Sequence, residues 1–240
     1  MKLYDPHHPQ KERAMDILAR LDETRAENNV LEHSFYQRWS AGDLSAEELR
    51  FYAGEYRHAV IALASASTQA ASCADEPHRS GLRRHAREET THVKLWEEFE
   101  RALGTPSEPV EREQPPVERA SQPLPQTRAC ARAWNAGEDL LEHLAVLYAI
   151  EASQPEISRT KLEGLAAHYG YRDEGPATEY FAVHELLDVE HARQAGELIE
   201  RLLAETDDPD EQAERMVSRA RAALRGNWLL LDGVEAASAA

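Results

Sequence analysis

One stretch of the sequence constrains the fold more than any other: His184-Glu185-Leu186-Leu187-Asp188-Val189-Glu190-His191. His184, Asp188 and His191 follow the spacing i, i+4, i+7, which places three possible metal ligands on one face of a helix. Apolar neighbours such as Phe181 and Leu187 lie nearby around this helix, so we expect the face to point inward. Buried imidazoles and carboxylates are strongly unfavourable unless they are paired or bind a metal. We therefore interpret the stretch as a core helix with metal ligands rather than a polar stripe on a surface helix.

Helical periodicity covers almost the whole chain, and no segment shows a convincing alternating strand pattern. The prolines gather in residues 105–125, which hold half of them, and this predicts an exposed connector. Long helices joined by short turns predict an all-α bundle. We assign residues 1–240 to a single domain, because neither half has enough apolar surface to fold alone. The expected helices lie at about Pro9–Asn28, Val30–Trp39, Ser45–Ser72, Pro77–Leu103, Thr127–Asn135, Glu138–Ser153, Pro155–Tyr169, Gly175–Ala204 and Asp208–Leu231, the last ending at Asp232-Gly233.

The composition argues against several classes of protein. A net charge of −17 repels phosphate backbones and anionic lipid, so we expect no nucleic-acid partner. No apolar run approaches the roughly 20 residues of a membrane helix, and the first residues lack the apolar core of a signal peptide. We therefore expect a cytoplasmic protein. Cys73 and Cys130 are expected to be small buried residues without a disulfide.

Two further segments offer carboxylate and imidazole ligands. Glu151 directly follows the apolar run 147–150, where a carboxylate needs either a cation or a partner such as an arginine. Glu89 precedes His92 by three residues, the spacing with which a bundle helix presents two ligands to one metal centre. Glu88, at i, i+4 from the same histidine, would serve almost as well, and His85 lies one heptad before it on the same face.

A carboxylate on the long helix expected at 45–72 completes the pattern. Glu55 lies between the aromatic residues Tyr52 and Tyr56, and by itself this position fits a metal ligand and an ordinary helix carboxylate equally well. Imidazole and carboxylate ligands without a thiolate suit iron or manganese better than structural zinc. The metal ligands that we expect are Glu55, Glu89, His92, Glu151, His184, Asp188 and His191.

Four stretches resemble a known family. The chain is similar to the heme-oxygenase-like di-metal oxidases and oxygenases, relatives of TenA and PqqC, and most of all to the branch of the chlamydial protein associating with death domains. This resemblance implies a TenA/PqqC-like helical bundle that holds two Fe(II) ions, takes dioxygen as co-substrate with an external reductant, and oxidises a small molecule. The stretches are 33–45, 151–165, 184–191 and 228–234, the first containing His33-Ser34-Phe35-Tyr36-Gln37-Arg38-Trp39 and the last reading Trp228-Leu229-Leu230-Leu231-Asp232-Gly233-Val234.

The ligand pattern of the family transfers cleanly to Glu151 and to the His-Asp-His triple, but less cleanly to the first half of the chain. In the chlamydial branch a carboxylate lies one heptad before the ligand histidine, and here that position is His85. The alkene-forming fatty acid decarboxylase branch instead has a Glu three residues before its histidine and another on the preceding long helix. Glu89 and Glu55 match that variant, so we prefer them.

The chlamydial branch also forms p-aminobenzoate from one of its own tyrosines, with a lysine as amino donor. Tyr36, Tyr52 and Lys161 fall at suitable positions for these catalytic roles, although they could equally line a pocket. Ile150 stands where a pocket built around an internal tyrosine should have an aromatic residue, and Lys161 could anchor a substrate carboxylate.

We therefore expect an external amine- or carboxylate-bearing metabolite as substrate, in C–C cleavage, desaturation or N-oxygenation. TenA-type thiamin hydrolysis needs a cysteine nucleophile, which the run 141–150 lacks. The alternatives are the self-sacrificing reaction and a non-catalytic helical interaction or regulatory protein. A homodimer and a monomer both remain open.

Overall fold

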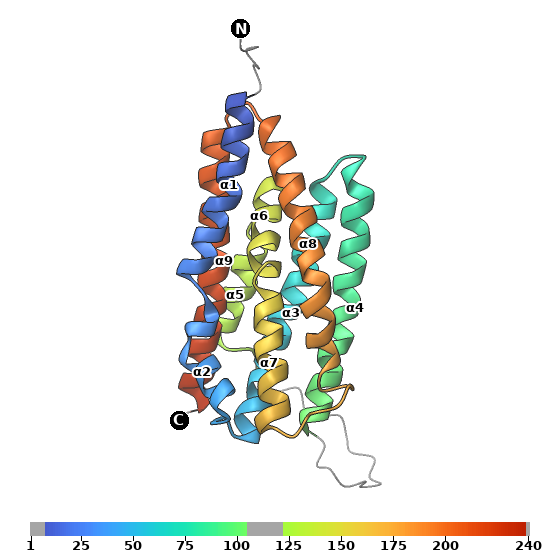
Figure 1. The fold of residues 1–240 in the computed structure, drawn as a ribbon, viewed down its shortest axis with the longest axis vertical. Helices are drawn as coiled ribbons and strands as arrows, with labels where there is room; N and C mark the ends of the chain where they lie inside the picture. Colours follow the sequence, from blue (N-terminus) through green and yellow to red (C-terminus); the bar gives the residue numbers. More distant parts are fainter. Residues whose placement is uncertain (1–7, 105–121, 239–240) are drawn as a thin grey trace.

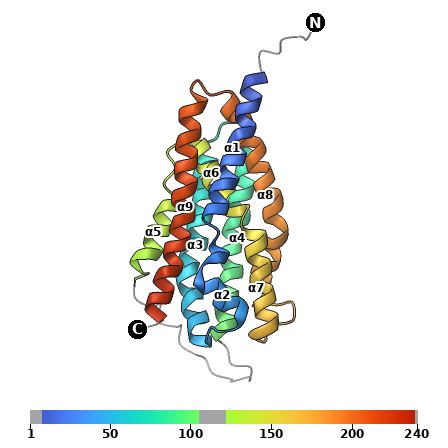
Figure 2. The same cartoon turned by 60° about the vertical axis from the view of Figure 1, so that its left-hand side comes forward.

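The computed structural model describes the backbone of residues 8–104 and 122–238, with side chains described from residue 17. Within these ranges all regular structure is helical, which confirms the predicted all-α class. Figures 1 and 2 show the long helices aligned along one axis, with the start of the first described helix and the end of the last at opposite ends. The helices are α1 (His8–Glu27), the 3-10 turn η1 (Val30–Glu32), α2 (Ser34–Ala41), α3 (Ala46–Cys73), α4 (His78–Gly104), α5 (Pro125–Trp134), α6 (Leu140–Glu151), α7 (Gln154–His168), α8 (Glu179–Ala204) and α9 (Pro209–Ser238).

Helices from both halves of the sequence pack on one another. Helix α1 contacts α8 and α9, and α3 contacts α5 and α6 as well as its neighbour α4. The expected connector lies mostly outside the described residues, and the single domain covering 1–240 stays a prediction. None of the described helices is both long enough and apolar enough to cross a bilayer.

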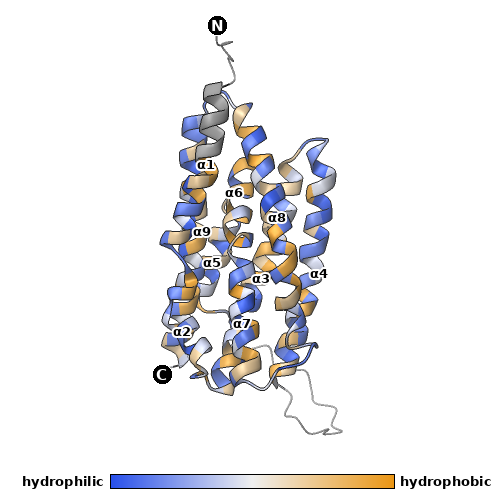
Figure 3. Cartoon of the chain, viewed as in Figure 1, coloured by the Kyte–Doolittle hydropathy of each residue, from blue (hydrophilic) through white to orange (hydrophobic). Residues whose placement is uncertain are grey.

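Helix α6 occupies the middle of the bundle, and this position explains its sequence. Figure 1 shows it between α1 and α9 on one side and α8 on the other. Its residues 141–147 and 149–151 are all buried, so it lacks the polar face that a surface helix carries. Figure 3 shows hydrophobic and hydrophilic residues alternating along the surrounding helices. Because α6 ends inside the bundle, its last residue, Glu151, is fully buried.

Local sequence signals set some helix boundaries as expected. At the start of α3, the Ser45 hydroxyl accepts a hydrogen bond from the Glu48 amide at 3.2 Å, and the Glu48 carboxylate accepts one from the Ser45 amide at 2.8 Å. This is the predicted capping box. Gly170 follows α7 with φ of +82°, the left-handed conformation that favours glycine after a helix.

Other boundaries differ from the sequence-based expectation. The helix expected over 30–39 is divided into η1 and α2 at His33, whose Nδ1 accepts a hydrogen bond from the Phe35 amide and caps α2. Helix α8 begins at Glu179 rather than at Gly175, because residues 175–178 form a hydrogen-bonded turn. Cys130 is buried, but the expectation for Cys73 was wrong, because it lies exposed at the end of α3; neither is in a disulfide.

The largest difference is in α9, which continues through Asp232-Gly233 to Ser238. A Cβ atom on Gly233 would lie 3.0 Å from the side chain of Gln126, and one on Gly226 would lie 3.1 Å from Cα of Cys130. Both partners belong to α5, so these glycines allow α5 and α9 to approach closely. Gly233 therefore serves helix packing and not, as expected, helix termination.

The close contact between α7 and α2 yields a prediction about stability. A Cβ atom on Gly164 would lie 2.5 Å from Nε1 of Trp39, a side chain that is fully buried and donates a hydrogen bond to the Lys161 carbonyl. Gly164→Ala should therefore lower the free energy of unfolding by about 1–3 kcal/mol, measured by chemical denaturation. Gly81→Ala is the control, since a Cβ there meets nothing within 4 Å, and it should raise stability by up to about 1 kcal/mol. Equal effects of the two substitutions would contradict this account of the packing.

Candidate metal centre

Three helices bring seven possible metal ligands together in the interior. Helix α4 supplies three of them, α6 supplies one from its end, and α8 supplies the three from the stretch 184–191. The seven side chains comprise four imidazoles and three carboxylates: His85, Glu89, His92, Glu151, His184, Asp188 and His191.

The ligand atoms form two neighbouring groups. In one, atoms of Glu89, His92 and His184 all lie within 4.8 Å of one another. In the other, the same holds for His85, Glu151 and His191. Asp188 lies within the same distance of Glu89 and His191, and so links the two groups.

Several buried polar atoms of this cluster have no hydrogen-bond partner among the described residues. They include both carboxylate oxygens of Glu151, both of Asp188, and Nε2 of His184. His85 Nε2 lies 3.0 Å from Glu151 Oε1, but without the alignment of a hydrogen bond. Buried carboxylate oxygens in this state are strongly unfavourable unless a cation binds them. The cluster therefore fits metal ions, and a set of oxygen and imidazole donors without thiolate suits iron or manganese.

Hydrogen bonds to the protein orient two of the imidazoles for this role. His184 Nδ1 donates a hydrogen bond to the Tyr180 carbonyl at 2.6 Å, which fixes the tautomer. The lone pair of Nε2, which has no hydrogen-bond partner, is therefore available to bind a metal. Burial also lowers the pKa of His184, so the ring is held neutral, as a metal ligand must be. His92 Nδ1 donates to Glu89 Oε1 at 2.9 Å.

The charges in the cluster are unevenly distributed. Burial acts to raise the pKa of Glu89, but the hydrogen bond from His92, together with the other imidazoles around it, outweighs burial and lowers this pKa to about 2. Burial acts to lower the pKa of His85, but the adjacent Glu151 carboxylate outweighs it and raises this pKa to about 9. Without metal, the proton on His85 therefore supplies positive charge that bound cations would otherwise supply.

The first-half ligands differ from the set that we preferred from the sequence. The structure brings both Glu89 and His85 into the cluster, whereas Glu88 is half-buried with its Oε2 3.3 Å from His191 Nε2. The structure does not bring Glu55 there. Its carboxylate accepts hydrogen bonds from the Leu124 amide at 3.1 Å and from the Thr127 hydroxyl, at the start of α5. A carboxylate at this position compensates unpaired amides at a helix N-terminus, which explains Glu55 without a metal.

A buried lysine lies among aromatic rings beside these seven clustered side chains, which are called the metal cluster below. Lys161 on α7 is 1% exposed, and its Nζ donates a hydrogen bond to the Tyr52 hydroxyl at 2.6 Å. The same Nζ lies 4.7 Å from the centre of the Tyr56 ring and 5.5 Å from that of Tyr36. Burial lowers the pKa of Lys161 well below its usual value, which favours the neutral, nucleophilic amine. The structure thus brings together the three residues for which the resemblance implies catalytic roles.

Ring contacts connect this lysine environment with the metal cluster. Tyr180 stacks on His184 with ring centres 4.0 Å apart, and Trp96 lies 4.8 Å from Tyr180. Tyr56 in turn lies 5.1 Å from Trp96. Sequence reasoning assigned no role to Trp96 or Tyr180. The signal that could have identified Tyr180 is its spacing: it precedes His184 by four residues, so the two side chains lie on the same face of the helix.

Comparison with known proteins identifies the family. Residues 51–228 match the model of a family described as iron-containing redox enzymes. The chain is 32% identical over 214 residues to a 4-aminobenzoate synthase of Chlamydia muridarum, covering 87% of this chain and 88% of the relative. It is 31% identical over 225 residues to a 4-aminobenzoate synthase of Nitrosomonas europaea, covering 86% and 85%.

Solved structures show the same fold at lower sequence identity. A TenA homologue from Pseudomonas syringae superposes with a TM-score of 0.72 at 17% identity, covering 92% of each chain. A domain of unknown function with a heme-oxygenase-like fold from Shewanella denitrificans gives 0.68 at 16% identity, covering 99% of this chain and 94% of that one. The predicted TenA-like fold is confirmed, and the alternative of a non-catalytic interaction protein is set aside. The chain belongs to the family of iron-containing redox enzymes, and it is an oxidoreductase with a heme-oxygenase-like fold.

Proposed function

We propose that this protein holds two iron ions on the seven clustered side chains and uses them with dioxygen to form 4-aminobenzoate. The observation that carries the two-ion centre is the buried, unpartnered donor set in two adjoining groups linked by Asp188. Iron bound there would supply the electrons that reduce dioxygen, and an external reductant would restore them. Three carboxylates offset much of the charge of two divalent ions, which is a further reason to prefer two ions to one.

The product is proposed from two independent observations. The relatives from Chlamydia and Nitrosomonas are named for 4-aminobenzoate synthesis and cover most of this chain. The product contains a six-membered aromatic ring and an amine, and the structure places the amine of Lys161 against the Tyr52 hydroxyl, buried next to the cluster.

The surroundings of Lys161 favour an internal source of the ring. The expectation of an external substrate relied on Ile150, where an aromatic residue was expected, and on a flexible Lys161 that could anchor a carboxylate. Instead the Lys161 amine is enclosed by rings, including those of Tyr56 and Phe181, and it does not line the pocket that reaches the cluster. We therefore replace that expectation by the self-sacrificing reaction, in which Tyr36 or Tyr52 supplies the ring and Lys161 the nitrogen.

The ligand set can be tested by substitution. His85→Ala, Glu89→Ala and His184→Ala should each lower bound iron substantially, because each removes a donor from one of the two groups, while circular dichroism stays near wild type. Iron content after anaerobic Fe(II) loading is the measurement.

Two control variants match these substitutions, one on α8 and one on α3. Glu190→Ala, on the exposed side of α8, should leave iron unchanged, and so should Glu55→Gln, which affects only the start of α5. Wild-type iron content in all three ligand variants would show that the cluster is not the metal centre.

The source of the product ring can be tested by intact-protein mass spectrometry. After iron, reductant and oxygen are supplied, we expect at most one 4-aminobenzoate per chain, a loss of mass that maps to Tyr36 or Tyr52, and a second change at Lys161, which gives up its amine nitrogen. Lys161→Arg should abolish the product, whereas Tyr148→Phe should not, because Tyr148 lies elsewhere on α6 and donates to Asp22. Unchanged protein mass with many product molecules per chain would restore the external substrate.

In the metal-free protein, protonation of His85 should make the free energy of unfolding depend on pH. Its pKa in the folded metal-free protein, about 9, exceeds its ordinary value of 6.5, so the proton stabilises the fold. This contribution is complete below pH 6.5 and is lost as the pH rises through 9. We expect metal-free wild type to lose, relative to His85→Gln, on the order of 2 kcal/mol of unfolding free energy between these pH values. Denaturation with a chelator present measures it, and parallel pH profiles of the two proteins would contradict the assignment.

A further inference from the structure

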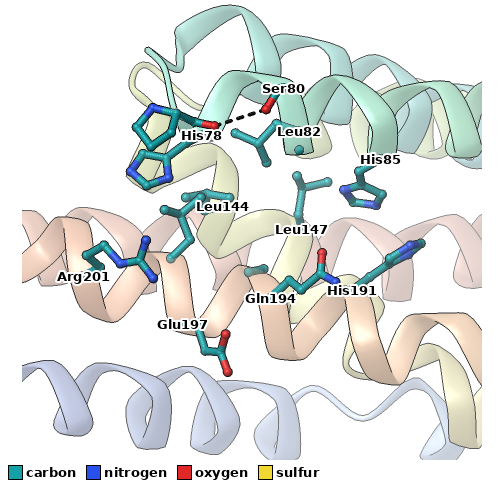
Figure 4. A pocket seen from close by; sticks show the side chains of 14 residues that line it. His78, Ser80, Leu82, His85, Leu144, Leu147, His191, Gln194, Glu197 and Arg201 are labelled. Carbon is teal, nitrogen blue, oxygen red and sulfur yellow. Dashed lines mark hydrogen bonds between the residues drawn. The ribbon is translucent and has the colours of Figure 1, made fainter.

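A pocket of about 290 Å³ opens between α4, α6 and α8, and its inner end is formed by two of the proposed metal ligands. Figure 4 shows His85 and His191 facing each other at one end of this pocket, and His78 and Arg201 near the other. Between the two ends the wall includes the leucines Leu82, Leu144, Leu147 and Leu198, together with polar side chains such as Gln194 and Glu197.

The exposure of the metal cluster is concentrated at this pocket. The side chain of His85 is 14% exposed and that of His191 is 9% exposed. The carboxylates of Glu89, Glu151 and Asp188 are at most 1% exposed, although they belong to the same cluster. Solvent therefore reaches the cluster from the side of α4 and α8 that the pocket occupies.

The opposite side of the cluster is closed by aromatic side chains. Tyr180 stacks on His184, and Trp96 packs against Tyr180, both with 2% exposure or less. Lys161 and Tyr52 lie behind these rings and are equally buried. A small molecule from solvent thus meets His85 and His191 first, and the residues to be oxidised last.

We propose that this pocket is the route by which dioxygen and other small apolar molecules reach the metal centre. The inference rests on the proposed function and adds a binding path and its lining residues. Leucine side chains favour an apolar diatomic molecule over hydrated ions. The rings of Tyr180 and Trp96 separate the inner end of this pocket from Lys161 and Tyr52, which keeps bulk water away from the reacting side chains.

Leu198→Trp tests the route, because it places a larger side chain in the pocket at a half-buried position of α8. Nitric oxide is the probe, since it binds Fe(II) with a visible absorption change and needs no turnover. We expect Leu198→Trp to slow nitric oxide binding to the iron-loaded protein by about tenfold, measured by stopped flow. Leu202→Trp, one turn later on α8 and outside the pocket lining, should bind at the wild-type rate.

Xenon provides a second measurement that does not require iron. Crystals of wild type and of Leu202→Trp pressurised with xenon should show the atom between Leu82 and Leu147, and those of Leu198→Trp should not. Loss of xenon together with an unchanged nitric oxide rate in Leu198→Trp would overturn the route. Iron content, measured on all three proteins, separates this result from failure of the proposed function: a wild-type protein that binds no iron contradicts the function itself.

Discussion

Uncompensated negative charge at the junction of α4, α6 and α8 is the constraint on which this structure depends. Helix α6 is buried almost all around and ends in Glu151, whose two oxygens find no hydrogen bond among the described residues. Asp188 is in the same situation on α8. Neither carboxylate can move to solvent without unpacking the central helix, so positive charge has to come to them. A proton on His85 supplies part of it, and metal ions can supply the rest.

The two sides of this charged centre differ in chemistry. Toward α2, α3 and α7, tyrosine and tryptophan rings enclose a lysine whose pKa burial depresses, which is an oxidisable and nucleophilic environment. Toward the solvent side of α4 and α8, leucines line a pocket that ends at two imidazoles. Oxygen entry on one side and oxidation on the other would prevent a reactive centre from being quenched by water. The fold therefore places the solvent-facing pocket and the oxidisable side chains on different sides of the centre.

Part of the candidate site could be predicted from the sequence. The spacing of His184, Asp188 and His191 places them on one helix face whatever the rest of the fold, and the same holds for Glu89 and His92. The apolar neighbours were a less secure guide, since Phe181 is buried but Leu187 is 42% exposed. Helical periodicity predicts that the three residues share one face of the helix. Because apolar residues lie on both sides of that helix, it does not predict whether this face points to the core or to solvent.

The sequence by itself determined the all-α class, most helix positions and the ligands that share a helix, because these follow from periodicity and local spacing. Only the tertiary structure shows that His85 lies with the clustered side chains and Glu55 does not, since this depends on how α3 and α4 are rotated against α5, α6 and α8. It also decided that Gly233 is a packing residue and not a helix end, because the close approach of α5 is a long-range contact. Burial of Lys161 against Tyr52 is of the same kind: residues 109 positions apart meet only after the bundle has formed.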